Sequence, residues 1–156
     1  MVSTIVAAAV IVVILIPPSY FAYVHRRQSL RRKEMLEVAS QVTPAVVESR
    51  KAHVAALAEW KLAVKNLKEA LPKLTHPGRR RADADTEIKS WERRLKAIEN
   101  VIPLLDEWIE QAYITKKKIE VLPMSAKTEL LNLGQKLGDL NEKGKGTLVR
   151  LVELVS

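Results

Sequence analysis

The chain contains no cysteine, which excludes disulfide bonds, thiolate catalysis and cysteine-based zinc sites. Aromatic residues are also scarce: one Phe, three Tyr and three Trp in 156 residues are few for a thick globular core. Glycine-rich phosphate loops and the common motifs of metalloproteases and serine hydrolases are missing as well. The three histidines are widely separated in the sequence. These absences argue against an enzyme, and they indicate neither a cofactor nor a metal site.

Charge is absent from the first 24 residues, and the formal net charge of +8 arises from two local clusters further along the chain. The first cluster comprises Arg26, Arg27, Arg31, Arg32 and Lys33, and the second comprises Arg79, Arg80 and Arg81. Nucleic-acid binding is not favoured, because such proteins usually spread their cations along a groove or a helix. The second cluster is instead a candidate contact for an acidic partner, with a solvated loop as the alternative.

Residues 1–24 are predicted to form a transmembrane anchor. The segment from Thr4 to Val24 has 21 uncharged residues, and a helix of that length spans about 31 Å, close to the hydrocarbon thickness of a bilayer. No basic residue precedes the apolar run and no Ala-x-Ala site follows it, so cleavage as a signal peptide is not favoured. Pro17 and Pro18 are expected to kink the helix near one end of the span.

The residues that follow the apolar run have the composition of a membrane interface. Aromatic rings settle at headgroup level, and each cation near an anionic leaflet contributes about 1 kcal/mol. The predicted lipid contacts are Tyr20, Phe21, Tyr23, Arg26, Arg27, Arg31, Arg32 and Lys33. Because all the flanking cations lie on the C-terminal side, the positive-inside rule places the N-terminus outside and the body in the cytoplasm.

The remainder is predicted to be all-α. A basic juxtamembrane helix is expected over 25–43, an antiparallel helical hairpin over 44–122 with its turn at 75–83, and a C-terminal region over 123–156. The C-terminal region is read as an amphipathic helix, a glycine linker at Glu142–Gly146 and a short apolar tail. Asp83 and Asp85 are expected to cap the second helix of the hairpin, and Pro103 is expected to kink or split it near Asn100.

Apolar residues recur at steps of three and four in both hairpin helices, which is the spacing of a coiled-coil seam. The predicted helix–helix interface comprises Leu57, Trp60, Val64, Leu67, Leu71, Ile88, Trp91, Leu95, Ile98, Ile102, Leu105 and Ile109. Two helices are too few to bury both stripes, so a third helix or a second copy is expected.

The leading functional hypothesis is a single-pass, membrane-anchored scaffold whose coiled-coil body associates with itself or with another helical protein. The order of an N-terminal anchor, a basic flank and interrupted coiled-coil helices also resembles an inner-membrane spanin, along the whole length of the chain. That resemblance implies a phage-type lysis function with the helical body outside the cytoplasmic membrane. A holin-like permeabilisation factor is the version of this alternative that keeps the charged body in the cytoplasm.

Overall fold

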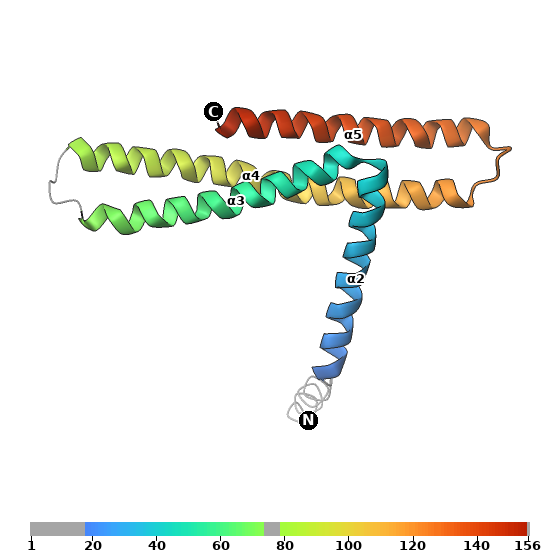
Figure 1. Ribbon diagram of the computed structural model, residues 1–156, viewed down its shortest axis with the longest axis horizontal. Coiled ribbons are helices and arrows are strands. Elements are labelled where there is room, and N and C mark those ends of the chain that lie inside the picture. Colours follow the sequence, from blue (N-terminus) through green and yellow to red (C-terminus); the bar gives the residue numbers. More distant parts are fainter. Residues whose placement is uncertain (1–17, 74–78, 156) are drawn as a thin grey trace, which may run out of the picture. The chain divides into compact units, whose positions relative to one another are not determined.

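The computed structural model describes residues 18–73 and 79–155, which are helical apart from short connections (Figure 1). The elements in chain order are α2 (Pro18–Val42), α3 (Pro44–Ala70), the 3-10 helix η1 (Leu71–Lys73), α4 (Arg79–Val121) and α5 (Lys127–Val155). The prediction of an all-α fold is confirmed for these residues. The chain divides into two compact units, Met1–Met35 and Leu36–Ser156, and α2 contributes to both.

The predicted anchor is covered only in part. Residues 1–17, which hold most of its apolar run, lie outside the described residues. Of the helices at 18–73 and 79–155, none combines the length and the apolar character needed to cross a bilayer.

The break between α2 and α3 falls at Thr43, directly before Pro44. A residue that precedes proline is disfavoured in the α conformation, so α2 ends there, while Pro44 is well suited to the first turn of α3. Thr43 is completely buried. Its hydroxyl does not cap α3 but donates to the carbonyl of Ala39 in α2 at 3.1 Å. The threonine thereby ties the end of one helix to the start of the next.

The helices α3 and α4 form a helical hairpin, as the sequence predicts, and α4 is its long member at 43 residues. Figure 1 shows the two helices running alongside each other in opposite directions. Their core centres on Trp60 and Val64 of α3 against Leu95 and Ile98 of α4, which are all buried. The rings of Trp60 and Trp91 meet edge to face with centroids 5.2 Å apart, a geometry that adds about 1 kcal/mol to the burial of the rings.

The sequence prediction for the C-terminal region needs correction. The predicted linker at Glu142–Gly146 is helical, and α5 runs unbroken for 29 residues, so there is no short separate tail. This helix packs against both α3 and α4 in the second unit (Figure 1). Leu151 and Leu154 join the hydrophobic cluster around Trp60 and Ile98. The two hairpin stripes are therefore buried by a third helix of the same chain.

One further prediction about α4 is wrong, and of the two alternatives predicted for Pro103 the split is contradicted. The helix begins at Arg79, so Asp83 and Asp85 lie inside it rather than at its cap. Pro103 also lies within the helix and does not split it. Proline lacks an amide donor and its ring crowds the carbonyl of Glu99, but Pro103 and Glu99 are both exposed, so water can satisfy the carbonyl that loses its partner.

Candidate functional site

The first part of α2 presents an aromatic and basic face. Tyr20, Phe21 and Tyr23 are 56%, 63% and 60% exposed, and the rings of Tyr20 and Phe21 lie 6.3 Å apart. A shallow groove of about 450 Å³ runs along this helix. It is lined by Tyr20, Tyr23, Val24, Arg27, Gln28 and Arg31. Residues spaced by three and four share one side of a helix, so the two tyrosine rings at the start of the groove are followed by the two guanidinium groups further along it.

All eight predicted lipid contacts lie on α2 and are exposed. No acidic residue is present in the first turn of the helix, and the first carboxylate in its sequence is Glu34. The hydroxyl of Ser29 donates a hydrogen bond to the backbone carbonyl of Arg26 at 3.0 Å, and the guanidinium group of Arg26 takes no part in that contact. The surface therefore combines apolar rings with positive charge, which suits the boundary between acyl chains and phosphate groups.

The predicted helix–helix interface lies in the core of the second unit. Ten of its members belong to one hydrophobic cluster, either buried or partly buried. These are Leu57, Trp60, Val64, Leu67, Leu71, Ile88, Trp91, Leu95, Ile98 and Ile102. The other two, Leu105 and Ile109, are 0% and 3% exposed and continue the same side of α4. These residues stabilise the bundle and leave little surface for a partner.

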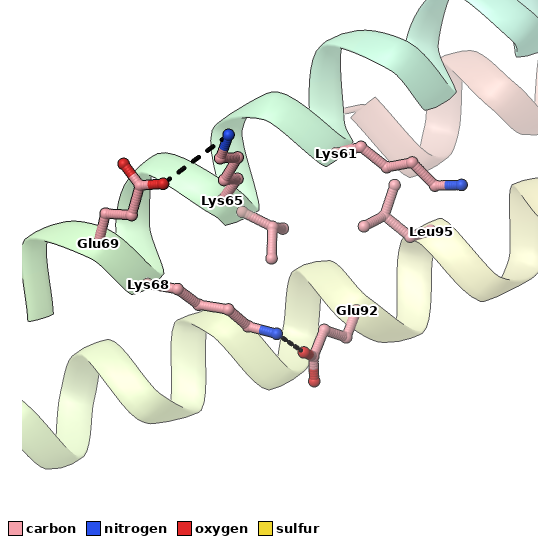
Figure 2. A pocket seen from close by; sticks show the side chains of 7 residues that line it. Lys61, Lys65, Lys68, Glu69, Glu92 and Leu95 are labelled. Atoms are coloured by element: carbon pink, nitrogen blue, oxygen red, sulfur yellow. Dashed lines mark hydrogen bonds and ion pairs between the residues drawn. The ribbon is translucent and has the colours of Figure 1, made fainter.

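An open groove of about 350 Å³ lies between α3 and α4, with Val64 and Leu95 as its apolar floor. Figure 2 shows Lys61, Lys65 and Lys68 arranged along α3 above this groove. Lys68 reaches across to Glu92 of α4 at 2.6 Å, whereas Lys65 pairs with Glu69 of its own helix at 3.9 Å (Figure 2).

The lysines of this groove are balanced by carboxylates. Lys61 pairs with Glu99 at 2.7 Å, so each of the three cations has an acidic neighbour. The side chains of these pairs are about half exposed, and exposed ion pairs contribute at most about 1 kcal/mol each. Two of the pairs, Lys61 with Glu99 and Lys68 with Glu92, link α3 to α4, and the groove offers no net charge to attract an anion.

A buried polar cluster joins α3 to α5. The hydroxyls of Ser49 and Thr147 are 2.7 Å apart, and Thr147 donates to the carbonyl of Gly144 at 2.8 Å. Four residues further along α3, His53 is only 2% exposed and its Nδ1 lies 2.7 Å from the carbonyl oxygen of Ser49. The side-chain oxygen of Asn141 accepts a hydrogen bond from the amide of Ala45 at 3.0 Å. Two of these contacts, Ser49 with Thr147 and Ala45 with Asn141, hold α5 against the first turns of α3, and the other two orient the side chains within each helix.

The proximity of a serine and a histidine does not make this cluster a catalytic dyad. A carbonyl oxygen only accepts hydrogen bonds, so Nδ1 of His53 carries the proton that it shares with Ser49. That nitrogen is then unable to take the proton of the Ser49 hydroxyl, which lies 3.3 Å away. Ser49 is also fully buried, out of reach of a substrate. The cluster is a structural element that holds two helices together.

A small pocket of about 220 Å³ lies beside this cluster. It is lined by His53, Ala97, Ile98, Val101, Thr147, Arg150, Leu151 and Leu154. Most of the lining is apolar, and the polar groups of His53 and Thr147 are engaged in the contacts described above. The pocket has the character of a packing gap where three helices converge.

The second arginine cluster occupies the first turn of α4, because Arg79, Arg80 and Arg81 are its first three residues. The predicted turn at 75–83 is therefore helical from Arg79 onward, while 74–78 and the arginine side chains lie outside the described part of the chain. Within 18–73 and 79–155 no group of three or more His, Asp and Glu side chains is positioned to hold a metal ion.

Sequence reasoning recognised an amphipathic helix and an apolar tail in this region but separated them by a linker, so it missed Gly144 and Thr147 as docking residues of α5. Its inward side carries Leu130, Leu133, Leu137, Leu140, Gly144, Thr147, Leu151 and Leu154, at alternating steps of three and four. The same spacing that revealed the hairpin seams is present here. It was obscured because the stripe passes through a glycine and a threonine within a segment that has the composition of a linker.

A comparison with protein-family models, with curated proteins and with solved structures finds no match to this chain. The function is therefore argued from its own residues.

Proposed function

We propose that this protein is a single-pass, membrane-anchored helical interaction protein. The observation that carries the proposal is the exposed aromatic and basic face of α2, which directly follows the uncharged segment of residues 1–17. Three exposed rings within four residues are costly in water and favourable at a bilayer interface. The anchor at 1–24 is part of the proposal, as are anionic lipids at the arginines and a body in the cytoplasm.

The interaction role is supported by the character of the second unit. Its core is closed by three helices of one chain, and of the two pockets described above one is charge-balanced and the other is small and apolar. Large apolar side chains nevertheless remain on its surface, among them Leu131, Val149 and Val152 at 72%, 58% and 65% exposed. A rigid helical body with apolar side chains outside suits contact with another protein better than turnover of a small molecule.

A cysteine-accessibility experiment tests the membrane topology. Leu131→Cys places a single thiol on an exposed position of α5 in a chain that has no other cysteine. We expect the protein to remain in the membrane fraction after an alkaline carbonate wash. We also expect an impermeant maleimide to label it only after the cells are permeabilised. Release by the wash contradicts the anchor. Labelling in intact spheroplasts contradicts the cytoplasmic body and favours the spanin-like alternative.

A lipid experiment tests the role of the arginines separately. Arg26→Gln with Arg27→Gln removes two cations from the face of α2 without altering the second unit. At about 1 kcal/mol per cation, the pair should account for roughly a thirtyfold difference in affinity for anionic over neutral vesicles. A peptide covering 18–42, with and without the substitutions, gives the measurement. Equal binding of both peptides to vesicles rich in phosphatidylserine refutes the assignment.

A further inference from the structure

The outward side of α4 carries a second stripe that the bundle does not use. Its members are Leu104, Glu107, Gln111, Ile114, Lys118 and Val121, again at alternating steps of three and four. The apolar members are exposed, with Leu104 at 48%, Ile114 at 44% and Val121 at 81%. One helix face therefore exposes an apolar side chain to water at each end and another near its middle. This pattern is typical of a coiled-coil seam that no other helix covers.

The spacing along this stripe is the same in both directions, and its single acidic and single basic residue lie at equivalent distances from the two ends. When a second copy of α4 is laid antiparallel, Leu104 meets Val121 and Gln111 meets Ile114. In that same register Glu107 meets Lys118, so each charged residue of the stripe faces one of opposite charge. The remaining facing pairs all contain an apolar side chain. Antiparallel coiled coils place their seam residues opposite one another in this way, and a two-fold axis repeats each contact.

The residues that flank the stripe agree with this register. Glu110 and Lys117 lie one position before Gln111 and Lys118, and the antiparallel arrangement brings the carboxylate of one copy to the ammonium of the other. Lys117 already pairs with Glu120 at 3.6 Å on its own helix, so it adds to a network across the interface. Glu107 accepts from Gln111 at 2.9 Å, which orients its carboxylate along the stripe.

We infer that α4 is a dimerisation surface, through which two copies of this chain associate antiparallel about a two-fold axis that crosses the stripe between Gln111 and Ile114. The inference rests on the proposed interaction role and names the partner as a second copy. A second copy is the partner that charge complementarity favours, because Glu107 of one copy pairs with Lys118 of the other. A different helical protein would need the same order of charges and apolar residues. Eighteen residues of helix span about 26 Å, which is a short interface suited to a reversible dimer.

Charge reversal provides a test that does not depend on loss of folding. Glu107→Lys and Lys118→Glu each place two pairs of like charges across the dimer, and each should weaken self-association about tenfold or more. A mixture of the two variants restores opposite charges at both positions. We therefore expect the mixture, and the double variant E107K/K118E alone, to associate nearly as well as the original chain. Glu87→Lys and Lys96→Glu are matched controls on exposed positions of α4 away from the stripe.

The measurement uses the full chain reconstituted in vesicles, with donor and acceptor dyes attached to separate copies through Leu131→Cys. Energy transfer between copies should fall for each single variant and return for their mixture. Equal transfer in all variants overturns the inference, since it shows association through another surface. The absence of transfer in the original chain at every protein density overturns it as well. In that case the proposed function is judged independently, by the membrane and topology tests above.

A crosslinking experiment checks the register. A chain with Leu104→Cys and a chain with Val121→Cys should form a disulfide with each other on mild oxidation, whereas either chain alone should crosslink poorly. Leu131→Cys with Val149→Cys is the control pair, because both residues are exposed on α5 and outside the stripe. Crosslinking of the control pair to the same extent refutes the register.

Discussion

Substitution of Gly144 by alanine is expected to destabilise the bundle, although the same change elsewhere in α5 should stabilise it. A methyl group at Gly144 would lie 2.6 Å from the amide nitrogen of Val46 and 2.8 Å from its Cα. It would also lie 2.8 Å from the carbonyl carbon of Ala45. These are backbone atoms, so no side chain can rotate away, and α5 must move from the start of α3.

The magnitude follows from two opposing contributions. Alanine is favoured over glycine in a helix by about 1 kcal/mol. Overpacking of a closed interface costs about 1–3 kcal/mol, and the movement also lengthens the hydrogen bonds of Asn141 and Thr147 to α3, which contribute about 1 kcal/mol each. We expect a net loss of about 1–3 kcal/mol in the free energy of unfolding.

The chain supplies its own controls in the same helix. At Gly134, Gly138 and Gly146 an added methyl group meets nothing within 4 Å. Alanine at each of these exposed positions should raise the free energy of unfolding by up to about 1 kcal/mol. The comparison therefore predicts opposite signs for one chemical change within one helix.

Thermal unfolding of the full chain, followed by circular dichroism in mild detergent, measures the difference. A change of 1 kcal/mol corresponds to about 4 °C for a unit of this size. We expect Gly144→Ala to lower the Tm by about 4–12 °C and each control substitution to raise it by up to about 4 °C. The packing of α5 against α3 is refuted if Gly144→Ala raises the Tm as much as the controls do.

Three further predictions concern the same bundle. Leu151→Ala should lower the free energy of unfolding, measured by urea denaturation, by about 2–4 kcal/mol because the side chain is buried against the Trp60 cluster. Val152→Ala, at a position 65% exposed, should change it by less than about 0.5 kcal/mol in the same assay. Ser49→Ala and Thr147→Val should each lower the free energy of unfolding by about 1–3 kcal/mol, and the double variant should lower it by clearly less than their sum, because each single change leaves the other hydroxyl without its partner. Strict additivity in this double-mutant cycle contradicts the direct hydrogen bond. Lys68→Gln should lower the free energy of unfolding by at most about 1 kcal/mol at low salt, and by less in 1 M NaCl, since the ion pair with Glu92 is half exposed. A loss that does not depend on salt points to packing of the lysine stem instead.

The hairpin was predictable because its signal is local. Ile88, Leu95, Leu105 and Ile109 recur at a spacing that only one helix face can satisfy, and all four are buried. The break at Thr43 was equally predictable, because the steric restriction before Pro44 acts within two residues. The aromatic and basic residues of α2 were identified as a surface on the same grounds, since composition alone separates them from the core.

The C-terminal region was misread because its stability is not local. Glycine is a poor helix former, and the segment Glu142–Gly146 has the composition of a linker. Gly144 is nevertheless buried, because its lack of a side chain lets α5 approach the backbone of Val46. The partner in this contact lies almost a hundred residues away in the sequence, so no local propensity reveals it. A search for steps of three and four through residues 130–154 would have indicated the helix, although not its neighbour.

The sequence by itself determined the helical class, the break at Thr43, the two hairpin seams and the concentration of aromatic and basic residues on α2. Each of these depends on interactions within one or two turns of helix or on the identity of the residues. The tertiary structure decided that α5 is a single helix and that it closes the hairpin core with Leu151. It also decided that Ser49 meets His53 and Thr147 inside the bundle, and that the outward stripe of α4 remains uncovered. Those outcomes depend on which distant helices meet, and the free energy of that contact outweighs the local preference of a glycine-rich segment to leave the helix.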